Sequence, residues 1–202
     1  MTRNRIIWGA VCVVASVLSG GAAVAADEPP DAVAPCLACH GDAGNNPVPG
    51  MLAPKLSGLH AQYLVKELND FKYGRRVFEA MNGFAKDLSP ADIKTVANYF
   101  AAQTRTPDEA TDAALAKQGQ QYVLHGIRDQ AVPACVNCHN DGVTGTFRYP
   151  RLAGQKADYV VNQLTNLKSG ARKNDFGQMS RVAMRLTDDQ IKAVAEYVST
   201  VN

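Results

Sequence analysis

Two short cysteine–histidine motifs are the residues of this sequence best suited to do chemistry. Each has the pattern Cys-x-x-Cys-His, at residues 36–40 and again at residues 135–139. Each motif brings two thiols and an imidazole together within five residues, so reactive groups and metal ligands lie side by side on one short piece of chain. The second copy begins 99 residues after the first, and this distance restricts what the chemistry can be.

Four kinds of chemistry use cysteines spaced in this way. Paired cysteines of an exported protein are most often disulfides. Zinc modules also combine cysteine with histidine, but the two pairs lie too far apart in the chain for an ordinary module. A lone Cys-x-x-Cys can be a redox disulfide, which expects a βαβ context that is absent here. In covalent haem attachment both thiols add to the vinyl groups and the adjacent histidine reaches the iron. The duplicated motif favours haem at Cys36, Cys39 and His40, and at Cys135, Cys138 and His139.

The duplication also indicates which methionines can fill the second axial position of each iron. Met81 and Met179 occupy equivalent places, 41 and 40 residues beyond the motif histidines. Met51 has no methionine counterpart, and Met184 is matched by Lys86. Because methionine is more often a filler of the apolar core than a ligand, we interpret Met51 and Met184 as core residues. We predict that Met81 and Met179 are the axial ligands.

Two further pairs of residues bear on these sites. His60 lies at a predicted helix start and His125 lies outside the repeat, so a surface or capping role is expected for both. Pro54 and Pro150 recur at equivalent positions. A ligating histidine usually donates its other ring N–H to a carbonyl, which fixes the tautomer and raises the basicity of the ring. The residues alone leave this carbonyl role and ordinary turn formation equally open for the two prolines.

The rest of the chain repeats in the same order as the motifs. The segment PKLSG at residues 54–58 recurs as PRLAG at 150–154, and the offset drifts only from 99 to 96 and then to 98. Two copies are too few for a solenoid, so we predict two similar domains related by internal duplication. We place the domains at residues 26–105 and 106–202, with a linker at about residues 104–111.

Apolar stripes at helical spacing set the fold class. The stripe over residues 64–71 predicts a helix that ends at Gly74, and the second copy repeats this pattern up to Gly170. The last helix of each copy begins at a capping residue, Ser89 or Thr187. No segment shows the alternation of a strand convincingly. We therefore predict an all-α fold with long loops between each cysteine motif and the next helix.

The two copies differ in what precedes the cysteine motif. A helix is predicted at Asp112–Leu124 before the second motif, ending near Gly126. Only nine residues, three of them proline, separate Ala26 from Cys36 in the first copy. The link between the copies is polar and short, so the two domains are expected to be close neighbours.

The first 25 residues have the features of a secretory signal peptide. Two arginines precede an apolar run over residues 6–18, and small residues occupy the cleavage positions in Ala23–Ala25. We predict cleavage near Ala25 and a periplasmic protein, with an uncleaved membrane anchor over residues 6–26 as the alternative. The fifth cysteine, Cys12, is then removed with the signal.

Composition and charge exclude several classes of protein. Of the 202 residues 46% are apolar, which is too many for a disordered chain. The formal net charge of +2 is too small to indicate nucleic-acid binding, and without the signal 19 basic residues match 19 acidic ones. Docking to partners is therefore expected through local basic patches, for which a solvated helix end is the alternative: Lys72, Arg75 and Arg76, or Arg172 and Lys173.

With two Cys-x-x-Cys-His motifs, two Pro-x-Leu-x-Gly segments, two late methionines and a capped final helix, the chain resembles the class I c-type cytochromes, and more closely the di-haem cytochrome c4 family. The resemblance covers nearly all of the chain after the signal. It implies two tandem class I cytochrome c-like domains, two covalently attached haem c groups, and propionates that face each other across the domain interface. It also implies thioethers at Cys36, Cys39, Cys135 and Cys138, axial pairs His40/Met81 and His139/Met179, and carbonyl acceptors at Pro54 and Pro150.

This resemblance implies a periplasmic electron carrier of a respiratory chain that delivers electrons to a terminal oxidase and is not an enzyme. Methionine ligation raises the potential relative to bis-histidine ligation, which suits that role. An electron-accepting subunit of a flavin, quinone or molybdenum dehydrogenase complex is the first alternative. A di-haem peroxidase is the second, and the paired methionines argue against its open iron. The expected partners are an upstream donor complex and a downstream oxidase or dehydrogenase, without nucleic acid; any membrane association is through these partners.

One feature departs from the family pattern. Domains of this family usually begin with a helix that leads into the cysteine motif, and the first copy has almost none. This departure predicts a less stable first domain, a more exposed haem there, or a face that docks on a partner.

Overall fold

The structure, a computed structural model, describes residues 28–202. The predicted signal, its cleavage site near Ala25 and Cys12 lie outside the described residues. Within residues 28–202 the regular structure is helical apart from one isolated bridge between Ile127 and Val132, which confirms the all-α prediction. None of the helices in that range is both long and apolar enough to cross a bilayer.

The N-terminal domain carries the first cysteine motif and four α-helices. Helix α2 packs against α3 and α4, and Phe100 is completely buried in the core that they share. Gly74 follows α2 with a φ of 71°, as expected of the left-handed residue that ends a helix. The elements are α1 (Ala34–His40), the 3₁₀ turn η1 (Asp42–Gly44), α2 (Ala61–Lys72), α3 (Glu79–Ala85) and α4 (Pro90–Ala101).

The C-terminal domain has the same elements and, before them, one more α-helix and one more 3₁₀ turn. The added helix α5 packs against α9, and α9 packs against α7. Asp112 caps α5 by accepting hydrogen bonds from two backbone N–H groups, so the helix predicted at Asp112–Leu124 is present. The elements are α5 (Ala113–His125), η2 (Arg128–Gln130), α6 (Val136–His139), η3 (Asp141–Val143), α7 (Ala157–Ser169), α8 (Gln178–Ala183) and α9 (Asp188–Thr200).

Among the short helices that were not predicted from the sequence, α3 and α8 matter most for the site. Helices α3 and α8 have no long apolar stripe, yet they carry Met81 and Met179 respectively. Each packs against the helix that precedes it, α3 on α2 and α8 on α7. These short helices therefore position the two methionines over the cores of their own domains.

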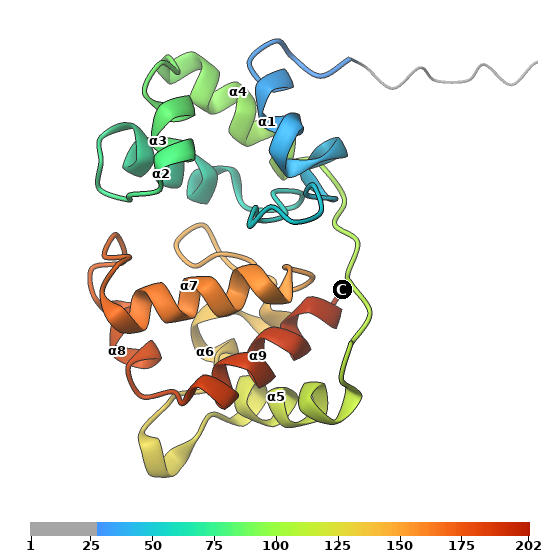
Figure 1. The fold of residues 1–202 in the computed structure, drawn as a ribbon, viewed down its shortest axis with the longest axis vertical. Helices are drawn as coiled ribbons and strands as arrows, with labels where there is room; N and C mark the ends of the chain where they lie inside the picture. The colour runs from blue at the N-terminus through green and yellow to red at the C-terminus, as the bar shows by residue number, and fades with distance from the viewer. Residues whose placement is uncertain (1–27) are drawn as a thin grey trace, which may run out of the picture.

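The two domains lie one above the other, with α2 and α3 of the upper domain turned toward α7 of the lower one (Figure 1). The chain between α4 and α5 runs along one side of both domains. Arg105 of this connection is buried and donates hydrogen bonds to the carbonyls of Lys55 and Ser57 in the first domain and of Ala153 in the second. One linker side chain thus contacts both domains at once.

Candidate functional site

The first cysteine motif lies on α1, at the start of the N-terminal domain, and the second lies around α6, after α5 and η2 of the C-terminal domain. All four of their cysteines are free thiols. Burial raises the pKa of the Cys36 thiol and raises that of Cys135 to about 11, so these thiols are not activated as a redox pair would be. In the described part of the chain, no three His, Cys, Asp or Glu side chains gather as metal ligands. The geometry gives no support to a zinc site or a redox disulfide.

Both motif histidines make the same hydrogen bond. His40 Nδ1 lies 2.8 Å from the carbonyl oxygen of Pro54, and His139 Nδ1 lies 2.8 Å from that of Pro150. A carbonyl can only accept, so Nδ1 carries the proton in both rings and donates it. Burial lowers the pKa of each ring, although the carbonyl partner acts in the opposite sense. Each histidine is therefore the neutral tautomer whose Nε2 has a free lone pair.

The free nitrogen of the second histidine has no partner in the protein. His139 Nε2 is buried, and within residues 28–202 it makes no hydrogen bond. A buried polar atom without a partner is rare and costs free energy, so it calls for an explanation. A group outside the polypeptide that accepts this lone pair supplies one, and a metal ion held in the adjacent cavity fits the chemistry of a neutral imidazole.

A cavity of about 1010 Å³ opens between the two domains and reaches both motifs. It is at the upper end of the ~300–1,000 Å³ range typical of ligand pockets. His40 and Met81 line it from the first domain, and His139 and Met179 line it from the second. The structure thus brings together at one cavity all the residues that were predicted as sites: Cys36, Cys39, His40, Pro54, Met81, Cys135, Cys138, His139, Pro150 and Met179.

The other methionines and histidines lie apart from these groups or at the surface. Met51 borders the cavity but is 43% exposed, and Met184 is 58% exposed outside it. The interpretation of Met51 and Met184 as core residues was therefore wrong. His60 and His125 are exposed at the N-terminal end of α2 and the C-terminal end of α5, and the side chain of His60 does not cap its helix.

Polar groups from both domains meet along the cavity wall. Arg76 of the first domain donates to Tyr159 and Gln163 of the second, at 2.9 and 2.8 Å. Arg172 of the second domain reaches back to Tyr63 and Glu67 of the first, at 3.2 and 3.3 Å. Both arginines are thus held between the domains. The prediction that they belong to exposed docking patches was wrong, as was the alternative of a solvated helix end.

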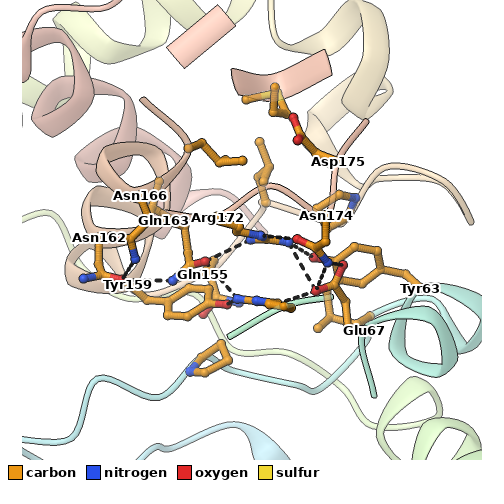
Figure 2. Close-up of a pocket in the computed structure, with 18 of the residues that line it drawn as sticks. Tyr63, Glu67, Gln155, Tyr159, Asn162, Gln163, Asn166, Arg172, Asn174 and Asp175 are labelled. Carbon is orange, nitrogen blue, oxygen red and sulfur yellow. Dashed lines mark hydrogen bonds and ion pairs between the residues drawn. The ribbon is translucent and has the colours of Figure 1, made fainter. Parts of the chain in front are cut away.

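The contacts across the interface are related by the same 96-residue offset as the Pro-x-Leu-x-Gly segments. Tyr63 corresponds to Tyr159, Arg76 to Arg172, and Glu67 to Gln163, so each arginine contacts the equivalent residues of the other domain. Figure 2 shows Arg172 extended between Gln163 on one side and Glu67 on the other. This reciprocal pattern is what a two-fold arrangement of duplicated domains produces.

The pair Glu67 and Gln163 breaks the symmetry in charge. Burial alone would raise the pKa of Glu67, but Arg172, Arg76 and Lys66 lower it to about 2. Glu67 therefore carries a negative charge between two guanidinium groups, whereas Gln163 is a neutral acceptor for both. From the sequence alone no role was predicted for Tyr63, Tyr159, Glu67 or Gln163. The shared offset was the signal that could have found them.

Comparisons with known proteins agree with these features. Residues 32–100 match the family model described as cytochrome C oxidase, cbb3-type, subunit III, and residues 116–202 match the one described as cytochrome c. A cytochrome c4 from Thiocapsa roseopersicina is 41% identical over 167 residues, which are 81% of this chain and 85% of that protein. The chain belongs to the cytochrome c4 family. It is therefore a di-haem c-type electron carrier that binds haem c covalently.

Two more relatives support this assignment and extend it. The crystal structure of reduced recombinant cytochrome c4 from Pseudomonas stutzeri superposes with a TM-score of 0.78 at 38% identity, covering 84% of this chain and 95% of that one. A protein of Thiomonas intermedia named thiosulfate dehydrogenase electron acceptor is 37% identical over 195 residues, 94% of this chain and 88% of that protein. The unpartnered His139 Nε2 and the free thiols beside the cavity fit the haem c that this family binds.

Proposed function

We propose that each domain holds one haem c through its own cysteine motif, histidine and methionine. The first site uses Cys36 and Cys39 for the thioethers and His40 with Met81 as axial ligands. The second uses Cys135 and Cys138, with His139 and Met179. The buried, unpartnered Nε2 of His139 is the single observation that carries this proposal, because it is a ligand atom with no protein partner.

When bound at these residues, haem c would supply one-electron exchange between ferric and ferrous iron. The residues of this chain hold and tune that couple. The carbonyls of Pro54 and Pro150 hold the protons of His40 and His139 at Nδ1 and leave Nε2 available. The apolar cores on which Met81 and Met179 pack exclude water from the sites.

The common cavity supports electron exchange between the two sites within one molecule. Both proposed ligand sets line the same cavity. The polar residues between them are buried or partly buried and are held by hydrogen bonds between the domains, so the two sites have a rigid relation to each other. We infer that the mature protein works in the periplasm, where it passes electrons from a donor complex to a terminal oxidase without catalysing a reaction of its own.

A second candidate is the electron acceptor of a dehydrogenase. The similarity to the thiosulfate dehydrogenase electron acceptor covers 94% of this chain, so it includes both domains. Rapid reduction of the purified protein by a thiosulfate dehydrogenase, or its co-purification with a catalytic subunit, supports this candidate. Turnover of a terminal oxidase by the isolated protein supports the first.

Ligand replacement tests the proposed sites. In M81A and in M179A we expect one of the two haems to lose the absorption band of methionine-ligated ferric iron while the other keeps it. M184A is the matched control, because Met184 is exposed outside the cavity and its replacement leaves both haems unchanged. If the spectrum of M81A or M179A is the same as that of the wild type, methionine ligation at that site is refuted. An enzyme with an open iron then becomes the better hypothesis.

Haem quantitation with a spectroelectrochemical titration tests the whole proposal. Two haems per chain, both low-spin in the resting protein, are expected. One haem per chain, or a high-spin component at rest, contradicts it. Mass spectrometry of the mature protein checks export, since a chain that begins near residue 26 indicates cleavage and an intact chain indicates an anchor.

A further inference from the structure

The peptide group between Pro54 and Lys55 is hydrogen-bonded at both ends. Its carbonyl oxygen accepts from Nδ1 of His40 at 2.8 Å. Its N–H, which belongs to Lys55, donates to the side-chain oxygen of Gln155 at 2.8 Å. Gln155 lies in the other domain, so a continuous chain of hydrogen bonds runs from the C-terminal domain through one peptide group to the first motif histidine.

The contact with Gln155 is buried and double. Gln155 and Lys55 are 5% and 3% exposed. The amide nitrogen of Gln155 donates back to the carbonyl of Lys55 at 2.9 Å, so both backbone polar groups of Lys55 are held by one side chain. Arg105 of the linker donates to the same carbonyl at 3.0 Å. Two hydrogen bonds from one side chain fix its orientation, and they are strong because water is excluded.

The second site has no such connection. His139 donates to the carbonyl of Pro150 as His40 does to that of Pro54. The backbone N–H of Arg151 is the counterpart of that of Lys55, and within residues 28–202 it donates to no backbone carbonyl and to no side chain. The position equivalent to Gln155 in the first domain is Leu59, a buried apolar residue. The connection is therefore present in one direction only.

We propose that Gln155 is a positioning residue that sets the hydrogen bond of His40 from across the domain interface. A peptide group that donates through its N–H is polarised, and its carbonyl becomes a better acceptor. A stronger acceptor at Nδ1–H makes the imidazole a stronger base toward iron. Hydrogen bonding around the ligands is one of the means by which a protein tunes a haem potential. The C-terminal domain thereby adjusts the first site, and this inference rests on the proposed assignment of His40 as an axial ligand.

Replacement of Gln155 by methionine tests the connection in the full-length holoprotein. Q155M keeps most of the side-chain volume but removes the amide. The weaker acceptor at His40 then stabilises ferric iron less, so we expect the potential of the first haem to rise and that of the second to stay. The ferrous-to-ferric ratio of the first haem at fixed applied potential increases several-fold, up to about tenfold, which is 59 mV for one electron. M81A and M179A assign the two potentials, because each perturbs one.

T106V is the matched control for loosening of the interface. Thr106 lies in the linker beside this contact and accepts a hydrogen bond from Asn45 at 2.7 Å through its hydroxyl. The variant is uncharged and isosteric, and it leaves the backbone of Lys55 untouched, so neither potential is expected to change. An equal rise of the first potential in T106V and Q155M overturns the proposal, because the effect is then one of general loosening.

Amide hydrogen exchange supplies a readout that needs no substitution. In the wild type the Lys55 amide is expected to exchange slowly and the Arg151 amide faster, and Q155M accelerates Lys55. Equal exchange of the two wild-type amides overturns the proposal even if Q155M does not fold. A shift of both potentials in Q155M, or of neither, also overturns it. Failure of the proposed function is separate, since it shows in the wild-type spectrum as a haem without low-spin histidine and methionine ligation.

Discussion

The last helices of the two domains are equivalent, but only one is covered. Thr95 and Asn98 of α4 are exposed. Their counterparts in α9, Ala193 and Glu196, are buried because α5 packs on α9. Glu196 accepts a hydrogen bond from the backbone N–H of Asp112 at 2.8 Å. The first domain lacks the covering helix and has polar residues on the face that it would cover. That face is adapted to water, so the first domain does not need a covering helix there.

The interface shows a second difference between the domains. Each arginine contacts the same pair of positions in the opposite domain, but one position holds the anionic Glu67 and the other the neutral Gln163. The hydrogen-bond geometry is nearly symmetric and the charge is not. Duplication thus preserved the contacts while the two halves diverged in electrostatics.

Removal of the Glu67 carboxylate is the change with the largest expected effect. In E67A the guanidinium groups of Arg76 and Arg172 lose their shared anion in a buried site, which weakens the association of the domains by about 3 kcal/mol. Q163A removes a neutral acceptor of two guanidinium groups and costs about 2 kcal/mol. Hydrogen exchange of α2 and α7 in the holoprotein measures both. Equal effects of the two variants would show that the charge of Glu67 does not distinguish the two positions.

The same carboxylate makes the interface sensitive to acid. The pKa of Glu67 is lowered from 4.5 to about 2 by its basic neighbours despite its burial. A lowered pKa gives stability that is fully present above the ordinary pKa and is lost as the pH falls through the lowered one. We expect the domains to loosen progressively between about pH 4.5 and pH 2, as measured by the exchange of α2 and α7. E67Q removes most of this dependence, and an unchanged acid transition in E67Q assigns it to another group.

Local signals in the sequence predicted the fold well, but they could not predict the contacts between the two domains. The caps at Ser89 and Thr187 were identifiable because both partners of a capping box lie within four residues. The motif residues were identifiable because their spacing is dictated by the chemistry they serve. Arg76 and Arg172 looked like surface residues because only the tertiary fold brings them to the other domain. Helices α3 and α8 were missed because such short helices are held by packing rather than by their own periodicity.

A glycine distinguishes the covered domain from the uncovered one. A Cβ at Gly119 in α5 would overlap the backbone carbonyl of Ala193 in α9, which cannot move without moving the helix. We expect G119A to destabilise the C-terminal domain by about 2 kcal/mol. G83A is the matched substitution in the first domain: Gly83 lies in α3 with open space around it, so the better helix former stabilises by up to about 1 kcal/mol. Chemical denaturation followed at each haem gives both values. The same sign for both would contradict the close packing of α5 on α9.

The caps of the two last helices give the smallest expected effect and test how far each domain is independent. Ser89 accepts from a backbone N–H of α4, and Thr187 does the same for α9. S89A and T187A each remove one such bond at about 1 kcal/mol. Because α4 and α9 lie in different cores, we expect S89A to accelerate exchange in α4 alone and T187A in α9 alone. If either variant accelerated amide exchange in both α4 and α9, the two domains would unfold as one cooperative unit. The contacts of Arg76, Arg172 and Glu67 across the interface would then join them.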